Sequence, residues 1–313
     1  MNIVQVEVST KCQLDCIMCP KSCFDDWIPK NMDMDVFEKI PFKKFKYAHL
    51  QGWGEPLLHP KIDEMIEIAK KRCKVGLTTN GLLIDRHVDS LTKLDLIAVS
   101  VASADPDVHA AVRKCDLEVI KRNIRLISEN RGKTRIVVTT IMMRDTIEGL
   151  PKMIDFASEC GADEVIANNL DYIPSESLTD LKVFGSKSDR RIGEIIEKTR
   201  KIAEDVGINF VARPIVMEEA LVCAENPIEN CLITVDGKIS PCVYLHLPTE
   251  SDRIVRYFEG ERVEVPKVYF NSLKDWEKSE IRKIFRRRLS FLPFTEIPPL
   301  PNVCRTCYKA YSL

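Results

Sequence analysis

Short apolar runs alternate with longer amphipathic segments over the first two thirds of the chain. The runs have the length and composition of β-strands and cover Ile3–Val8, Tyr47–Gln51, Lys74–Thr78, Leu96–Ser100, Ile136–Ile141 and Glu164–Asn168. Between them, apolar residues three and four positions apart predict helices over Ile62–Lys71, Ile84–Lys93, Leu117–Asn130 and Leu150–Glu159. Such alternation favours parallel strands joined by right-handed crossovers. The pattern therefore predicts an α/β fold, an open and partial (β/α)6 TIM-like barrel.

The pattern changes after the sixth predicted strand. Residues 170–190 contain Pro, Ser and Gly and few periodic apolar positions, which predicts a loop over the barrel mouth. A helix over Asp189–Val206 and a short strand within 207–215 follow. We place a domain boundary near Pro214, which gives a barrel domain of residues 1–214 and a smaller cysteine-rich domain of residues 215–313.

Composition excludes some classes of function. A net charge of −1 over 313 residues gives no overall attraction to nucleic acid or to a membrane surface. The first residues are strand-like and not a secretory signal, and no apolar stretch approaches the roughly 20 residues of a membrane span. We therefore expect a cytoplasmic protein without a membrane or nucleic-acid partner. Twelve cysteines in such a chain favour metal ligation over disulfides.

A loop with three cysteines directly follows the first predicted strand. Cys12, Cys16 and Cys19 have the spacing C-x3-C-x2-C. Three thiolates on so short a loop can bind three irons of a [4Fe–4S] cluster and leave the fourth iron open for a small molecule. The alternatives are a partial zinc site or buried thiols, but zinc sites usually add a second C-x2-C or histidines, which this loop lacks. Cys23 has no assigned role.

Polar motifs occur at the ends of the next predicted strands, where barrels of this type carry their reactive groups. Two glycines in Gly52-Trp53-Gly54-Glu55-Pro56 permit a sharp turn and a close approach of backbone to a ligand, and Glu55 suits an ammonium group. The other motifs are Thr78-Thr79-Asn80-Gly81 and the segment that begins at Ser100. Taken alone, Asn-Gly and Gly-x-Gly are ordinary turns.

Together, the cysteine loop and these motifs resemble the radical S-adenosylmethionine (SAM) superfamily. The resemblance implies that Gly52, Gly54 and Glu55 hold the SAM amino group, that Thr79 and Asn80 lie beneath its ribose, and that Ser100 contacts its ribose or carboxylate. Three positions depart from the family pattern, namely Met18, Ala102 and Ser103, and Arg113 is a candidate for the SAM carboxylate.

The same resemblance implies the reaction. SAM would chelate the open iron at Cys12, Cys16 and Cys19, and one electron would cleave it to a 5′-deoxyadenosyl radical that takes a hydrogen atom from the substrate. A low-potential donor, a ferredoxin or a flavodoxin, is then needed.

Five more cysteines return after residue 215. The run from Cys223 through Gly237 to Cys242, with the closing pair Cys304 and Cys307, resembles the auxiliary-cluster module called SPASM, or twitch in its shortened form. Because the chain ends at Leu313, we expect one auxiliary [4Fe–4S] cluster, bound by Cys223, Cys242, Cys304 and Cys307. Cys231 competes with Cys223 for a place, and a zinc site of four cysteines is the structural alternative.

The substrate is inferred only from resemblance. The runs 51–60 and 236–246 and the closing C-x2-C resemble radical SAM maturases associated with tungsten-pterin aldehyde oxidoreductases. The first hypothesis for the function is therefore a role in maturing a tungsten-pterin cofactor or its enzyme. Modification of a peptide whose leader is bound by a separate chain is second, because only eleven residues precede Cys12. A non-catalytic iron–sulfur electron carrier is third. The basic helix Lys278–Leu289 is expected to be a solvated face or to meet an anionic partner.

Overall fold

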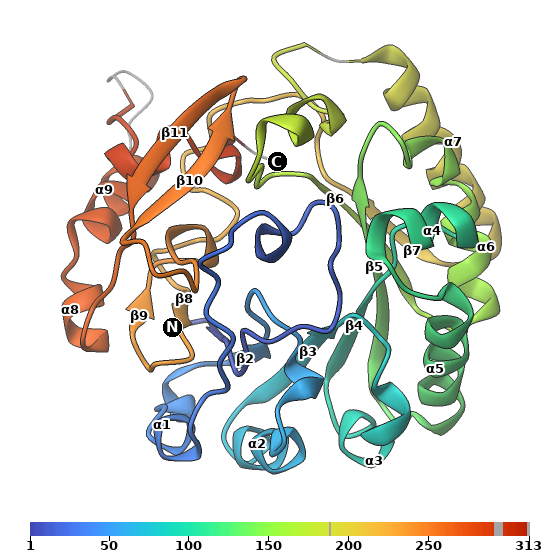
Figure 1. Ribbon diagram of the computed structural model, residues 1–313, viewed down its shortest axis with the longest axis horizontal. Coiled ribbons are helices and arrows are strands. Elements are labelled where there is room, and N and C mark those ends of the chain that lie inside the picture. The colour runs from blue at the N-terminus through green and yellow to red at the C-terminus, as the bar shows by residue number, and fades with distance from the viewer. Residues whose placement is uncertain (188, 291–296, 312–313) are drawn as a thin grey trace.

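A curved sheet of mostly parallel strands forms the centre of the protein, with helices around its outside (Figure 1). The computed structural model describes residues 1–187, 189–290 and 297–311. The strand order is β7-β6-β5-β4-β3-β2-β1-β8-β9, and every neighbouring pair from β7 to β8 is parallel. Their bounds are β1 Ile3–Val6, β2 Tyr47–Leu50, β3 Lys74–Thr79, β4 Leu96–Ser100, β5 Arg135–Met142, β6 Glu164–Asn169, β7 Asn209–Ala212, β8 Cys231–Ile233 and β9 Ile239–Ser240.

The predicted barrel is confirmed. Most of the helices predicted from amphipathic patterns are present at the expected positions. Helix α5 has the predicted bounds, Leu117–Asn130, and begins where the Asp116 side chain accepts a hydrogen bond from Glu118 N. Its apolar face is buried against the sheet. The other helices of the barrel are α1 Met34–Glu38, α2 Ile62–Lys70, α3 Val88–Leu91, α4 Pro106–Arg113, α6 Lys152–Glu159 and α7 Arg190–Val206.

Two local predictions differ from the structure. The helix predicted over Ile84–Lys93 is broken at His87, where backbone angles of φ −132° and ψ 19° separate a short 3-10 turn from α3. The His87 ring is held there by Asp63 of α2, at 3.0 Å. Helix α4 was not predicted, although Asp105 caps it through the N–H groups of Asp107 and Val108 and proline is its first residue.

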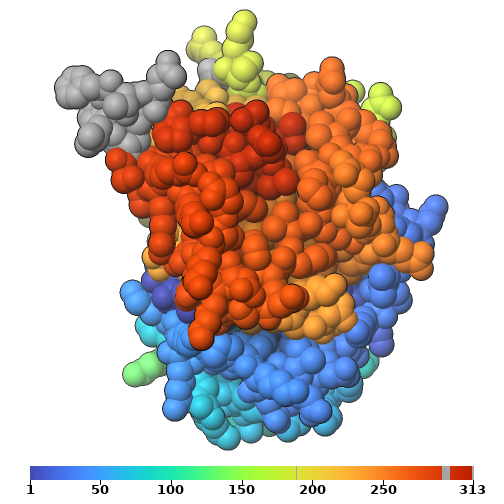
Figure 2. Space-filling view, turned by 90° about the vertical axis from the view of Figure 1, so that its left-hand side faces the viewer, coloured from blue at the N-terminus to red at the C-terminus, as the bar shows by residue number. Residues whose placement is uncertain are grey.

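The C-terminal cysteine-rich part joins the barrel through its first strands. Strand β8 pairs in parallel with β1, and a turn at Asp236-Gly237, where Gly237 has a φ of 78°, connects it to the antiparallel strand β9. The boundary near Pro214 stays a prediction. Figure 2 shows the orange and red surface of this C-terminal part lying directly against the blue surface of the N-terminal residues. It contains the antiparallel pair β10 (Arg253–Phe258) and β11 (Glu261–Pro266), and the helices α8 (Leu273–Glu277) and α9 (Glu280–Leu289).

The prediction that the basic helix is a solvated face is wrong for two of its arginines. Arg282 and Arg288 of α9 are buried, and Arg288 donates to the carbonyl oxygens of Leu221 and Ala220 and to the Glu219 carboxylate. These contacts tie α9 to the segment before Cys223. Among the described residues, no helix is both long and apolar enough to cross a bilayer.

Candidate functional site

The cysteine loop lies at the end of β1, on the edge of the sheet where the parallel strands finish. Cys12, Cys16 and Cys19 line one cavity of about 470 Å³, and Cys16 is buried against the end of α4. Burial raises the pKa of Cys19 to about 12, and the neighbouring Cys16 and Cys12 add to the rise. Burial also raises the pKa of Cys12. Three thiols this close become thiolates together only when positive charge joins them, so the donor set fits an iron cluster.

Glu55, in the second predicted motif, accepts hydrogen bonds from several residues around it. Its buried carboxylate accepts hydrogen bonds from Thr79 Oγ1 at 2.7 Å, Asn80 N at 2.7 Å and Leu57 N at 3.0 Å. Burial raises the pKa of Glu55, while these hydrogen bonds oppose the rise. The carboxylate thus fastens the loop after β2 to the end of β3 and still borders the cavity.

The two glycines of this motif serve packing within the protein. A Cβ atom on Gly54 would lie 2.4 Å from the Ser9 carbonyl oxygen, and one on Gly52 would lie 2.2 Å from Glu7 Cγ. The two glycines therefore allow a close approach to residues 7–11, between β1 and Cys12, whereas the sequence predicted a close approach to a ligand. Glu7 and Ser9 belong to the segment that leads into Cys12. The two glycines therefore help to position the thiols.

The remaining predicted contacts border the same cavity. Asn80 Nδ2 lies 3.8 Å from Cys12 Sγ and 3.2 Å from Gln13 Oε1, so the third motif touches the cysteine loop directly. Ser100 lines the cavity beside Thr139, at 3.5 Å between their hydroxyl oxygens. Arg113 also lines it, and its Nε is buried without a hydrogen-bond acceptor among the described residues. The structure thus brings the three cysteines of the loop and the residues of the strand-end motifs together at one cavity.

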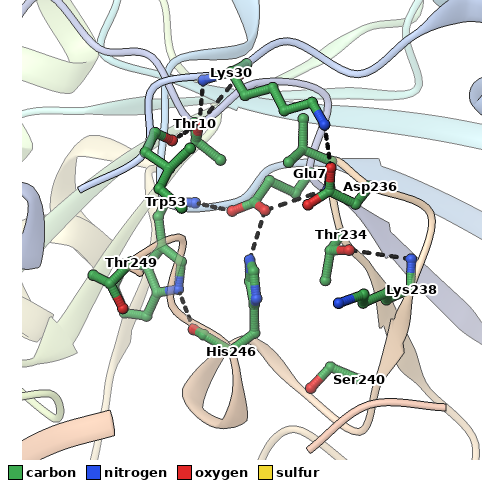
Figure 3. A network of polar contacts seen from close by, with 12 residues as sticks. Glu7, Thr10, Lys30, Trp53, Thr234, Asp236, Lys238, Ser240, His246 and Thr249 are labelled. Carbon is green, nitrogen blue, oxygen red and sulfur yellow. Dashed lines mark hydrogen bonds and ion pairs between the residues drawn. The ribbon is translucent and has the colours of Figure 1, made fainter. Parts of the chain in front are cut away.

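A buried carboxylate that the sequence analysis missed connects this site to the C-terminal part (Figure 3). Glu7, the residue directly after β1, is fully buried, accepts from Trp53 N at 3.0 Å and lies 2.7 Å from His246 Nε2. His246 Nδ1 contacts the Tyr269 hydroxyl at 2.7 Å, and the His246 carbonyl accepts from Trp53 Nε1 at 2.7 Å. Glu7 alternates with apolar residues in the strand pattern, which hid it as an ordinary outward-facing position.

Four cysteines of the C-terminal part lie together. Cys223, Cys242 and Cys304 belong to one apolar cluster, and the charge of Cys307 acts on Cys223, Cys242 and Cys304. Burial raises the pKa of Cys223 to about 12 and that of Cys242 well above its usual value. Cys231 lies apart from them, on β8 within the sheet.

The two thiol groups share one feature of their geometry. Within the described residues, no three Cys, His, Asp or Glu side chains converge closely enough to hold a single metal ion. A zinc site requires such convergence, with each sulfur about 2.3 Å from the same ion. A cubane cluster binds each thiolate through a different iron, so its cysteines lie further apart.

The cavity that the cysteine loop lines also contains a charged group that sequence reasoning missed. Lys309 Nζ lies 2.6 Å from Asp171 Oδ2, and the Tyr244 hydroxyl donates to Asp171 Oδ1 at 2.7 Å. Burial lowers the pKa of Lys309, but the carboxylates of Asp171 and Glu225 more than offset this, so it is raised. Burial raises the pKa of Glu225, which lines the cavity beside them. These residues are far apart in sequence, and only folding unites them.

Comparisons with known proteins agree with this arrangement. Residues 6–157 match the sequence model of the Radical SAM superfamily. The chain is 26% identical to the tungsten-containing aldehyde ferredoxin oxidoreductase cofactor-modifying protein of Pyrococcus furiosus over 90% of this chain and 80% of that one. It is 27% identical to a probable GTP 3′,8-cyclase of Methanococcus maripaludis over 76% of this chain and 84% of that one.

Solved structures show the same fold at lower sequence identity. Streptococcus suis SuiB bound to S-adenosylmethionine superposes with a TM-score of 0.66 at 16% identity, over 91% of this chain and 67% of that one. Native anSMEcpe with bound AdoMet superposes with a TM-score of 0.63 at 15% identity, over 91% of this chain and 83% of that one. The fold therefore extends beyond the matched residues 6–157 into the C-terminal part.

Proposed function

This chain belongs to the radical SAM superfamily of iron–sulfur enzymes, and on this premise we propose that it acts in the maturation of a tungsten-pterin cofactor or of its oxidoreductase. The family implies a [4Fe–4S] cluster and S-adenosylmethionine as cofactors. Together they supply a 5′-deoxyadenosyl radical that abstracts hydrogen from a substrate. The named relative in Pyrococcus furiosus supports the finer assignment, because its similarity covers both the barrel and the cysteine-rich part.

One observation carries the proposal. The thiols of Cys12, Cys16 and Cys19 border the same cavity as Gly52, Gly54, Glu55, Thr79, Asn80 and Ser100. We assign the three cysteines to the SAM-binding cluster and the other residues to SAM itself. Glu55 in addition holds the loop after β2 against the end of β3, because its carboxylate accepts hydrogen bonds from Leu57, Thr79 and Asn80. The cavity walls orient the substrate and exclude bulk water.

The charged wall is the part of the cavity that we assign to substrate. Asp171, Tyr244 and Lys309 form a connected group that can hold or move a proton next to the radical site. Glu225 has a carboxylate on the cavity surface and suits ring or amino N–H donors of a polar heterocycle. The pterin of the proposed substrate carries such donors. A peptide would place its backbone amides there instead, and this is the competing assignment.

The C-terminal part is proposed to bind one auxiliary [4Fe–4S] cluster through Cys223, Cys242, Cys304 and Cys307. Three of these cysteines pack in one apolar cluster of side chains, and the charges of the four thiols act on one another, which supports this set. Cys231 lies apart from them on β8, which supports leaving it out. We keep the proposed boundary near Pro214 between the two parts. A ferredoxin or flavodoxin would supply electrons at low potential.

The first experiment is anaerobic reconstitution followed by iron, sulfide and product analysis. Two cubane clusters correspond to about eight irons per chain. With dithionite and SAM, the protein should form 5′-deoxyadenosine, and Cys16→Ala should abolish it. Cys73→Ala is the matched control, because Cys73 lies at the end of α2 and outside the cavity. An electron carrier without catalysis would form no 5′-deoxyadenosine in either protein.

The substrate requires a separate experiment. Addition of isolated pterin cofactor, or of the cofactor-free tungsten oxidoreductase, should raise 5′-deoxyadenosine formation above the uncoupled rate. Asp171→Asn should remove this stimulation and keep the uncoupled rate, because Asp171 is on the substrate wall. Stimulation by a peptide and not by the pterin would overturn the tungsten-pterin assignment and leave the radical chemistry intact.

A further inference from the structure

Strand β10 carries an arginine at a core position. The strand alternates, and Ile254 and Arg256 both point inward, with Arg256 only 3% exposed. A guanidinium stays protonated at any ordinary pH, so this position holds a permanent buried charge. Such a charge is stable in a protein interior only when an anion and hydrogen-bond acceptors surround it.

The acceptors present satisfy less than half of this guanidinium. Nη2 donates to the Val303 carbonyl at 2.6 Å and to Thr306 Oγ1 at 3.1 Å, and both acceptors are neutral. Nε and Nη1 are buried and have no hydrogen-bond partner among the described residues. A guanidinium has five N–H donors, and three of them belong to these two atoms. The side chain is thus suited to an anion that the described part of the chain does not itself provide.

The position of Arg256 identifies that anion. Val303 and Thr306 flank Cys304 and Cys307, so the hydrogen bonds of Nη2 hold the guanidinium against the closing C-x2-C segment. Four thiolates that bind a cluster leave the centre with a net negative charge. We propose that Arg256 is the counter-charge and N–H donor of the centre at Cys223, Cys242, Cys304 and Cys307, and that it raises the reduction potential of the auxiliary cluster. The inference rests on the auxiliary cluster of the proposed function.

The direction of the effect follows from charge. Reduction adds one electron to the cluster and makes it more negative, and a fixed positive charge nearby stabilises that product. Hydrogen bonds to the sulfurs act in the same direction. Arg256 therefore positions the auxiliary cluster for electron transfer by tuning its potential, and it takes no direct part in bond cleavage.

The test isolates the auxiliary cluster in the full-length chain. Cys12, Cys16 and Cys19 are replaced by alanine, so that only the C-terminal centre remains. Iron and sulfide are counted at about four each per chain for one cubane. A redox titration followed by electron paramagnetic resonance then gives its midpoint potential. In this background we compare Arg256→Met, Arg256→Lys and, as control, Arg253→Gln on the exposed side of the same strand.

Arg256→Met should lower the midpoint potential, Arg256→Lys should lower it less, and Arg253→Gln should leave it unchanged. An unchanged potential in Arg256→Met overturns the inference and leaves the auxiliary cluster in place. Zinc or no sulfide in the background protein overturns the auxiliary cluster itself. If Arg256→Met does not retain its cluster, iron binding restored by Arg256→Lys supports charge compensation. Loss of the cluster in both variants would show that side-chain shape, and not charge, is required.

Discussion

Glu7 shows how a single buried carboxylate can connect two parts of this molecule. Because a carboxylate only accepts hydrogen bonds, His246 Nε2 donates in their contact, and the Nδ1 atom of the same ring contacts the Tyr269 hydroxyl. The other oxygen accepts from Trp53 N, inside the loop assigned to SAM. Glu7 thus acts as a positioning residue between the SAM loop and the C-terminal part.

We predict that Glu7→Gln weakens both folding and SAM binding. The carboxylate accepts from Trp53 N, His246 Nε2 and Val235 N, whereas the amide has a single acceptor oxygen, so its NH2 group faces at least one of these donors. Hydrogen bonds to charged groups contribute about 1.5 to 3 kcal/mol, and this loss should appear in denaturant unfolding. SAM affinity, measured by calorimetry on the reconstituted protein, should fall as well. Glu38→Gln, on the exposed side of α1, is the control. Affinity equal to that of the control would contradict the positioning role.

His109 provides a prediction for pH. Burial lowers its pKa to about 4, and the charge of Arg113 adds to the effect. The ring is fully buried, and its Nδ1 accepts from Ala102 N at 3.3 Å. The unfolded chain binds a proton near its ordinary pKa of about 6.5, while the folded chain does not. Stability from neutral His109 is therefore complete above pH 6.5 and is lost as the pH falls toward 4.

The variant His109→Gln should lack this loss. Wild-type stability should decline relative to the variant by on the order of 1 to 3 kcal/mol as the pH falls from 6.5 toward 4. The measurement is denaturant unfolding of both proteins across this range. Acid damage to the clusters affects both and cancels in the difference. A constant difference between the two proteins would contradict the assignment.

At the scale of elements, the sequence pattern predicted the bounds of an element when the signals for them lie within that element. Helix α5 has its own cap and a continuous apolar face, and the sequence predicted its bounds. The break at His87 depends on Asp63 of another helix, so the helical pattern at 84–93 could not reveal it. The glycines of the second motif were recognised, but their partners within residues 7–11 became visible only in the fold.

The close approach at Gly54 makes a sharp prediction for the cysteine loop. In Gly54→Ala, the new Cβ would overlap backbone atoms of Ser9 and Thr10, which cannot rotate away as a side chain can. Overpacking of this kind costs about 1 to 3 kcal/mol, and here it displaces the segment that leads to Cys12. We expect the loss of about four of eight irons and of SAM cleavage.

Gly132→Ala is the matched control for this substitution. Nothing lies within 4 Å of a Cβ atom built on Gly132, in the turn before β5. It should retain its iron content and its rate of 5′-deoxyadenosine formation. Normal iron in Gly54→Ala would show that the loop tolerates the shift and that Gly54 does not place the thiols.

At the scale of the whole molecule, the sequence predicted the thiols better than their surroundings. Ligand spacing on one loop is local, so Cys12, Cys16 and Cys19 could be assigned together. The wall of Asp171, Tyr244 and Lys309 joins the end of the barrel to the C-terminal part, and no local pattern marks it. Arg256 was equally hidden, because its partners are nearly fifty residues away in sequence.

The choice among the C-terminal cysteines can be decided because the fold separates them. Cys231 is on β8, whose neighbour in the sheet is β1, whereas Cys304 lies in the group with Cys223 and Cys242. Cys304→Ala should therefore reduce iron from about eight to about four per chain, and Cys231→Ala should leave it unchanged. Because Cys12, Cys16 and Cys19 and the residues we assign to SAM lie in the barrel, uncoupled 5′-deoxyadenosine formation should persist in Cys304→Ala. Loss of iron in Cys231→Ala would instead assign that strand cysteine to the cluster. Loss of uncoupled SAM cleavage in Cys304→Ala, with four irons retained, would mean that electrons reach the barrel through the C-terminal centre.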